Sequence, residues 1–392
     1  MRYINVFALI AWLGLVMIVS AEPPPAVQAE DRLSSDIMLL LGSSHPASDP
    51  DAVAAAWKRV VNAGPGALSP LMVAARKAGP LPRNWLLSAA DQIVLREHRT
   101  GRNIPKELIL ALLNDLENPP QGRWWAYQWL KQQDEGYARE IVKRFLNDPG
   151  AELRRAAIAA EIESLGDLKN LSDLPQDDPR RKDAIQKLRQ LFEAARDRDQ
   201  VEELAQLLRQ FGEQVDLGAH YGYITTWWFV GPFDNHEGVG FETVYPPETQ
   251  ATMPDLTATY QGKHGPVTWK KVTTPDDYGT FDLNKIIGEE KGVVAYAVAL
   301  IVSAKEQPAE IRVATPNAIK VWGNGQPLGA FHVYHSGFED DQYRLSWRLH
   351  QGTNWIMIKV CQNEQTQDWA RFWTFRLRVC DELGGGVGRQ SE

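Results

Sequence analysis

Hydrophobic residues recur with a period near 3.6 in the first half of this chain and with a period of two in the second half. From Ser35 to about Gln214 the spacing predicts helices, for example along the apolar stripe from Leu108 to Leu116. From Thr225 onward, apolar and polar residues alternate in short runs separated by turn residues, which predicts strands. The predicted fold class is multidomain α and β, with an N-terminal all-α helical repeat or bundle followed by a C-terminal β-sandwich.

The clearest predicted helix lies in the sequence D-P-G-A-E-L-R-R-A-A-I-A-A. Asp148 is expected to cap this helix, and Pro149 to occupy its first position. The piece resembles one unit of a HEAT-type repeat, in which short helix pairs stack into a solenoid. A solenoid needs about three or more units, and the neighbouring helices carry no clean period. An irregular helical bundle is therefore the alternative.

Two stretches organise the predicted sandwich. The nearly continuous apolar run from Val293 to Val302 predicts a central strand that is covered on both faces. The stretch from Trp227 to Glu248 predicts a strand that ends at Gly231-Pro232, followed by an ordered loop that closes on Y-P-P-E. This stretch marks the change from helix to sheet.

The N-terminus predicts export. Met1-Arg2 supplies a positive start, Val6 to Val19 is apolar apart from Gly14, and Val19-Ser20-Ala21 forms a small-residue cleavage pattern. The apolar run is shorter than the roughly 20 residues of a spanning helix, which favours a signal peptide over an uncleaved anchor. No later segment is long and apolar enough to span a membrane, so a secreted or periplasmic location is expected.

Together these patterns divide the chain into five parts: a signal peptide (1–21), a polar linker (22–34), a helical, HEAT-like domain (35–216), a β-sandwich (217–383) and a flexible tail (384–392). The net charge of -8 argues against nucleic acid as a partner, because a nucleic-acid-binding face is basic. Cys361 and Cys380 are the two cysteines. They can form a disulfide if their strands lie in opposing sheets, and are out of reach if the strands form a hairpin.

The segment from Val294 to Val379 resembles the galactose-binding-like jelly roll that accompanies glycoside hydrolases as a sugar-binding accessory domain. The matching pieces include I-K-V-W-G-N-G from Ile319 and L-H-Q-G-T-N-W-I-M-I-K-V from Leu349. With its helical half, the whole mature chain is similar to secreted planctomycete-type proteins of unknown function. Relatives of the jelly roll often read small-Asp-Asp-Gly where this chain has Thr315-Pro316-Asn317-Ala318. The acidic pair that would contact a cation or a sugar hydroxyl is therefore missing.

Sugar binding requires an aromatic face flanked by planar hydrogen-bonding side chains. The residues with this chemistry on the predicted loops are the candidate ligand-binding set: Trp369, Arg371, Asn363, Tyr334 and His335. The alternative is that these side chains only pack the sandwich. Trp373 alternates with Phe375 and Leu377 and is expected in the core.

Oxygen ligands in the loop after the first strand form a candidate calcium site, made by Asp234, Asn235 and Glu248. The alternative is that the Asp-Asn pair bonds its own backbone and holds the turn. The pair His332 and His335, followed by three carboxylates, has neither the zinc-finger nor the H-E-x-x-H spacing. Apart from this calcium, no cofactor is expected.

No catalytic motif accompanies these sites: the sequence contains no G-x-S-x-G and no phosphate-binding glycine loop between strand and helix. The expected function is therefore non-enzymatic, that of an exported scaffold or interaction protein that binds envelope or extracellular components. The alternative is a carbohydrate-binding accessory protein that recognises extracellular polysaccharide through the sandwich. The expected partners are other envelope proteins or extracellular polysaccharide.

Overall fold

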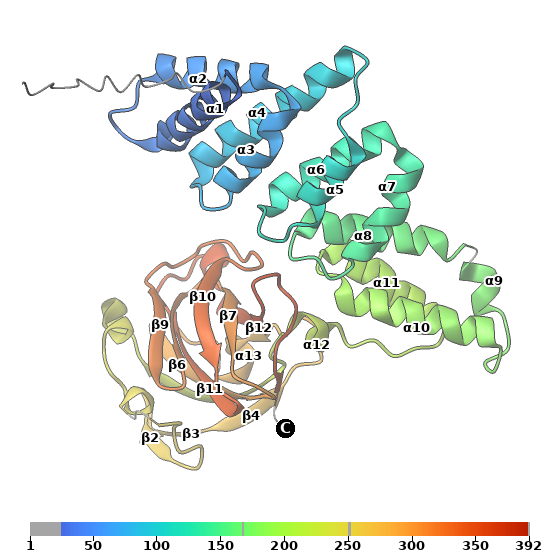
Figure 1. The fold of residues 1–392 in the computed structure, drawn as a ribbon. Coiled ribbons are helices and arrows are strands. Elements are labelled where there is room, and N and C mark those ends of the chain that lie inside the picture. Colours follow the sequence, from blue (N-terminus) through green and yellow to red (C-terminus); the bar gives the residue numbers. More distant parts are fainter. Residues whose placement is uncertain (1–24, 167, 250–251, 391–392) are drawn as a thin grey trace, which may run out of the picture. The chain divides into compact units, whose positions relative to one another are not determined.

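The computed structural model describes residues 25–166, 168–249 and 252–390. Helices fill the first half of this part of the chain and antiparallel strands the second (Figure 1), as predicted. These described residues form two compact units, one that runs to residue 139 and one that begins at residue 140. The predicted signal peptide lies outside the described residues. Within them, no helix combines the length and apolar character needed to cross a membrane.

The first unit is built from helices that pack in sequential pairs, α1 with α2, α3 with α4 and α5 with α6. Pro25 to Ser34, expected as a linker, instead belongs to the first of them, because alanine, glutamine, glutamate and arginine in this polar stretch favour helix. The helices are α1 (Pro25–Leu41), α2 (Pro50–Ala63), α3 (Leu68–Ala75), α4 (Pro80–Arg99), α5 (Lys106–Asn114), α6 (Pro120–Gln133) and α7 (Glu135–Val142), which ends just past the unit.

The second unit begins with α8 (Ala151–Ser164), α9 (Leu168–Ser172), α10 (Pro179–Ala194), α11 (Arg198–Gln210) and α12 (Leu217–Tyr221). Helix α8 starts later than predicted: Gly150 is its N-cap, and Asp148 Oδ1 accepts from Gly150 N at 2.7 Å. The predicted division at residue 216 falls before α12, and the helices from α8 to α12 belong to the same compact unit as the strands.

The strands form a large sheet in the order β4-β1-β6-β11-β8-β9, with β13 also paired to β6, and a small sheet in the order β10-β7-β12-β5. A hairpin, β2-β3, stands apart from both. The bounds are β1 (Thr226–Asp234), β2 (Thr259–Gln261), β3 (Pro266–Thr268), β4 (Lys270–Thr273), β5 (Phe281–Asp282), β6 (Val293–Ser303), β7 (Gln307–Ala314), β8 (Ala318–Gly323), β9 (Gln326–Phe331), β10 (Tyr343–Leu349), β11 (Gly352–Gln362), β12 (Thr374–Cys380) and β13 (Arg389–Gln390), with a short helix α13 (Leu283–Ile286) after β5.

Strand β1 does not end at Gly231-Pro232, as the sequence suggested. Its register against β6 shifts between Val230 and Phe233, and pairing then resumes to Asp234. A bulge of this kind accommodates a proline, which cannot donate to the ladder.

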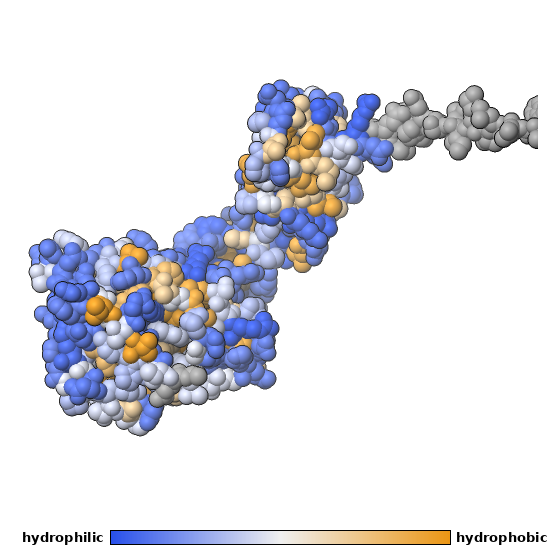
Figure 2. Space-filling model, turned by 90° about the vertical axis from the view of Figure 1, so that its left-hand side faces the viewer, coloured by the Kyte–Doolittle hydropathy of each residue, from blue (hydrophilic) through white to orange (hydrophobic). Residues whose placement is uncertain are grey.

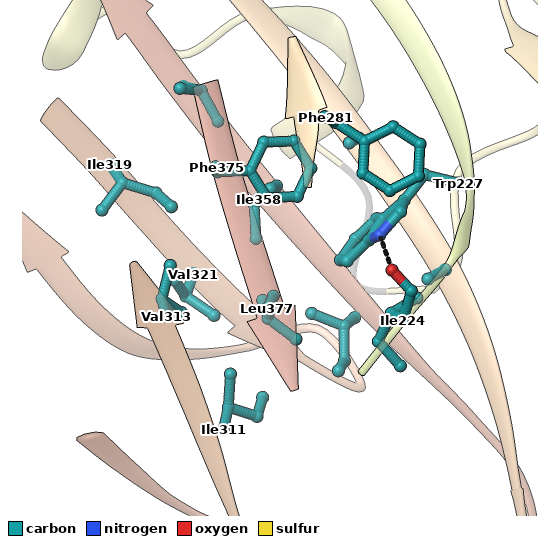
Figure 3. Close-up of a cluster of buried hydrophobic side chains, with 14 of the residues drawn as sticks. Ile224, Trp227, Phe281, Ile311, Val313, Ile319, Val321, Ile358, Phe375 and Leu377 are labelled. Carbon is teal, nitrogen blue, oxygen red and sulfur yellow. Dashed lines mark hydrogen bonds between the residues drawn. The ribbon is translucent and has the colours of Figure 1, made fainter. Parts of the chain in front are cut away.

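The main core lies between the two sheets (Figure 3). Ile358 from the large sheet and Val313, Phe375 and Leu377 from the small sheet are fully buried there. Trp227 packs edge-on against Phe375, with ring centroids 5.4 Å apart, and its Nε1 donates to Ile224 O at 3.2 Å. The alternation that predicted these strands thus identifies their inward-facing residues.

A second apolar layer covers the other face of the large sheet. Along β6 the side chains between those of the main core, Val294, Tyr296 and Val298, join it. They pack beneath a covering segment, residues 235–249 and 252–268, which contributes Phe241 and Tyr245. The prediction of a doubly covered central strand is confirmed.

A buried ion pair fastens the covering segment to the sheet. Lys359 of β11 has no exposed side-chain surface and lies 2.6 Å from Glu248 Oε1. Its Nζ also donates to Phe241 O at 3.1 Å and Thr243 O at 2.7 Å, and Tyr296 donates its hydroxyl to the same Glu248 oxygen. All three donors of the ammonium are therefore satisfied.

The outer face of the small sheet is polar and meets α11. Asp340 accepts from the Tyr223 hydroxyl at 3.0 Å and pairs with Arg376 at 2.7 Å and with Arg198 of α11 at 3.3 Å. The next residue, Asp341, pairs with arginines of β7 and β12. Ion pairs and hydrogen bonds thus join the last helices to the sandwich.

The expected tail is corrected, and the open question of the cysteines is answered. Residues 384–390 form no free tail: Gly386 N donates to His220 O at 2.8 Å, and β13 pairs with β6 at Val302 and Ile301. The cysteines do lie in opposing sheets, but both are buried and free. Cys361 belongs to the second apolar layer, and Cys380 alternates with the inward-facing Val379, so the two thiols point away from each other.

The ion pair at Glu248 predicts a selective loss of stability. We expect Glu248→Gln to lower the free energy of unfolding by about 3 kcal/mol, since it leaves a buried ammonium without its counter-charge. Glu242→Gln is the matched control: Glu242 also pairs with a lysine of the large sheet, Lys320, at 2.9 Å, but its side chain is 77% exposed. The control should cost under about 1 kcal/mol in urea unfolding. Equal losses would contradict the assignment.

His220 predicts an acid-dependent loss of stability. Burial and the neighbouring Arg196 lower the pKa of His220 to about 4, although its ring also bonds Ala195 O at 3.0 Å. An unfolded histidine titrates near 6.5. Protonation therefore favours the unfolded chain, so this contribution is complete above pH 6.5 and is lost as the pH falls towards 4.

His220→Gln should remove about 2 kcal/mol of the stability difference between pH 7.5 and pH 4.5, measured by urea unfolding. A variant whose pH dependence matches that of the natural chain would contradict this role.

Candidate functional site

Two loops at one edge of the sandwich carry the predicted ligand-binding residues. The β9–β10 loop (332–342) holds Tyr334 and His335, and the β11–β12 loop (363–373) holds Asn363, Trp369 and Arg371. Rings from the two loops meet: the His335 and Trp369 centroids are 4.9 Å apart, with their planes at 89°. The fold therefore brings these two loops into contact.

Buried amides hold the β11–β12 loop. Asn317 donates to Phe372 O at 3.1 Å and to Gln362 Oε1 at 3.2 Å, and its Oδ1 accepts from Thr374 N at 3.1 Å. Gln362 in turn points its Nε2 at the carbonyls of residues 370–372, at 3.4 to 3.5 Å. Both amide side chains are fully buried, so the loop is fixed from inside the protein.

Trp369 projects from this frame into solvent. It sits in a single turn of 3₁₀ helix, Asp368–Ala370, and is 56% exposed although its neighbour Ala370 is fully buried. His335, at φ 56°, lies in the left-handed region, and its Nε2 is buried with no hydrogen-bond partner in the part of the chain that the structure describes. Such backbone conformations are costly for residues other than glycine and often mark binding sites.

Tyr334 and Asn363 line a shallow hollow of about 470 Å³ together with Glu237, Glu364 and His332, among others. The Tyr334 hydroxyl accepts from Asn235 Nδ2 at 3.1 Å, and burial raises the pKa of Tyr334 to about 12. Asn363 bonds the side chain and backbone of Gln365. Asn363 thus presents a polar side chain to this acidic hollow, whereas the Tyr334 hydroxyl contacts the buried Asn235.

Arg371 lies in a different hollow, of about 710 Å³, whose lining includes Phe372 and Trp373. Its guanidinium is 5.6 Å from the centroid of the Phe372 ring, and Phe372 is 53% exposed. Trp373 is fully buried and donates to Val360 O at 3.3 Å, which confirms its place in the core. The five candidates therefore do not surround one cavity: one hollow takes two of them, a second takes Arg371, and Trp369 stands in contact with His335.

Two of the three candidate calcium ligands are paired with lysines: Glu248 with Lys359, as described above, and Asp234 with Lys263 at 3.2 Å. Asn235 donates its Nδ2 to Gln362 O at 3.0 Å and to the Tyr334 hydroxyl, partners distant in sequence rather than its own turn. Its Oδ1 is buried and has no hydrogen-bond partner among the described residues. Among the described residues, no group of three or more His, Cys, Asp or Glu is placed to hold a metal ion.

Sequence reasoning missed Phe372 and the buried amides. Phe372 precedes the inward-facing Trp373, so strand alternation indicates that its ring points outward. No comparable signal exists for Asn317, because its bonding partners are distant in sequence. A comparison of the chain with protein-family models and with curated proteins finds no match.

Substitution of Asn317 tests whether the buried amides of Asn317 and Gln362 hold the β11–β12 loop. Asn317→Ala leaves Thr374 N and Gln362 Oε1 without their buried partners, so we expect a loss of about 2–3 kcal/mol in the free energy of unfolding and faster proteolysis of the loop at 363–373. The control is Asn363→Ala, which removes a rim amide bonded only within its own turn and should cost less than about 1 kcal/mol. A loop equally resistant to protease in Asn317→Ala would rule out the frame.

Proposed function

We propose that this chain is an exported, non-enzymatic binding protein whose sandwich recognises an extracellular polysaccharide at the Trp369 edge. The observation that carries the proposal is a half-exposed indole held on a fully buried amide frame. An aromatic ring that is already fixed in place binds the C–H face of a sugar without a further loss of its own conformational entropy. The polar rims on either side supply hydrogen bonds of the kind that orient a ligand.

The arrangement of strands supports a galactose-binding-like jelly roll. From β6 to β12 the chain passes repeatedly between the two sheets, and the connecting loops at 332–342 and 363–373 form the candidate edge. The sequential pairing of helices, which recurs for α10 and α11, supports a HEAT-like array in the helical half. Export rests on the predicted signal peptide.

A second candidate, a scaffold that binds other envelope proteins, is favoured by the first unit. Large apolar side chains are exposed along its helices, among them Met38, Val73, Leu81 and Leu116. On the face shown in Figure 2, apolar surface is prominent on this unit, whereas on the sandwich it is broken into spots among hydrophilic residues. Apolar surface on a helical array suits a protein partner.

Trp369→Ala tests the glycan proposal. We expect binding to an extracellular polysaccharide, measured by affinity electrophoresis and a glycan array with and without calcium, to fall at least about tenfold, because the stacking surface is lost. Leu116→Ala, which removes a side chain that is 66% exposed in the other unit, is the control and should bind normally. If the natural chain binds no glycan in either condition, the scaffold becomes the better account.

A further inference from the structure

The hollow beside Phe372 carries a small excess of positive charge. Its lining includes three cations, Arg371, Lys285 and Lys291, and two carboxylates, Asp282 and Glu289. Aromatic surface from Phe338 and Phe372 completes it. Cations thus outnumber carboxylates here, although the whole chain has a net charge of -8.

These cations are only weakly neutralised by the protein. Lys285 is 84% exposed and lies 3.7 Å from Asp282, a loose surface pair. Lys291 donates to a neutral acceptor, Ala370 O, at 2.9 Å. The Arg371 guanidinium rests on the Phe372 ring, and no carboxylate of the described residues lies within ion-pair distance of it. Its planar fork of donors is therefore free to bind a carboxylate or sulfate.

The other hollow has the opposite character. Its lining includes Glu237 and Glu364, and Glu364 lies 2.5 Å from the ring of His236. An anionic ligand would be repelled there. The two hollows are lined by residues on either side of Trp369, 363–365 and 371–374, so the loop separates an acidic hollow from a cationic one.

We propose that the polysaccharide bound at this edge is acidic, and that Arg371, with Lys285 and Lys291 nearby, binds its uronate carboxylates or sulfate esters. The inference rests on the proposed function and names the class of ligand. Trp369 and Arg371 are separated by a single residue, so the indole and the guanidinium are within reach of one short oligosaccharide. The exposed Phe372 ring offers a second apolar face in the same hollow.

The test uses the full mature chain and four probes: polygalacturonate, heparin, a neutral galactan and poly-L-glutamate. Binding is measured by titration calorimetry at two salt concentrations. We expect both acidic polysaccharides to bind more tightly than the galactan, with an affinity that falls as salt rises. Poly-L-glutamate, a polyanion without sugar rings, should bind at least about tenfold more weakly.

Arg371→Gln should weaken binding of the acidic polysaccharides about tenfold and change galactan binding less than about twofold, since it removes a charge-assisted contact and no stacking surface. Arg209→Gln removes an equal charge from helix α11 and is the matched control, expected to bind as the natural chain does. The ratio of the affinities for polygalacturonate and heparin distinguishes recognition of carboxylates from recognition of sulfate esters.

Three outcomes would overturn the inference: equal affinity for galactan and the acidic probes, equal affinity for poly-L-glutamate, or unchanged binding in Arg371→Gln. In the first and third cases Trp369→Ala still reports on glycan binding, so the proposed function survives independently. If no polysaccharide binds at all, both the proposed glycan-binding function and the inference of an acidic ligand fail.

Discussion

One buried ammonium governs the architecture of the sandwich. The large sheet is apolar on both faces, and the small sheet covers only one of them. The other is covered by a segment with little regular structure, which must be held by side-chain bonds. Lys359 provides them, because a charge inside the protein is tolerable only when its donors reach Glu248 and the carbonyls of residues 241 and 243. Because these bonds form only when Glu248 and the two carbonyls lie beside Lys359, the buried ammonium fixes the position of the covering segment on the sheet.

Much of this fold is readable from the sequence, and the reasons differ from element to element. Strand alternation identified the inward-facing residues of β12, because a period of two directly reports which face is buried, and the nearly continuous apolar run identified the double coverage of β6. Lys359 breaks an apolar run, yet its partner lies 111 residues away and no local pattern links the two. The first ten residues of α1 were missed because that stretch is polar, and β13 was missed because its surroundings are glycine-rich and its pairing with β6 is distant in sequence.

The candidate site shows the same division. The chemistry of Trp369, Arg371 and Tyr334 was visible in the sequence, as were the loops that carry them. The sequence did not show that Tyr334 and Arg371 line two different hollows, one acidic and one cationic. That division depends on residues from the covering segment and from the region around α13. Asn317 is instructive: no local pattern in the sequence marks it, whereas in the structure it is an internal support for the loop.

The strand β13 has a topological consequence. Gln390 accepts hydrogen bonds from the backbone of Thr225 and Thr226, at 3.0 and 3.1 Å, where the chain enters β1. The first and last residues of the sandwich therefore adjoin. A domain whose two ends meet can be joined to a host protein through one point of attachment without disturbing its strands. Circular permutation of the strands through a short linker would have to keep the helices from α8 to α12, because they belong to the same compact unit.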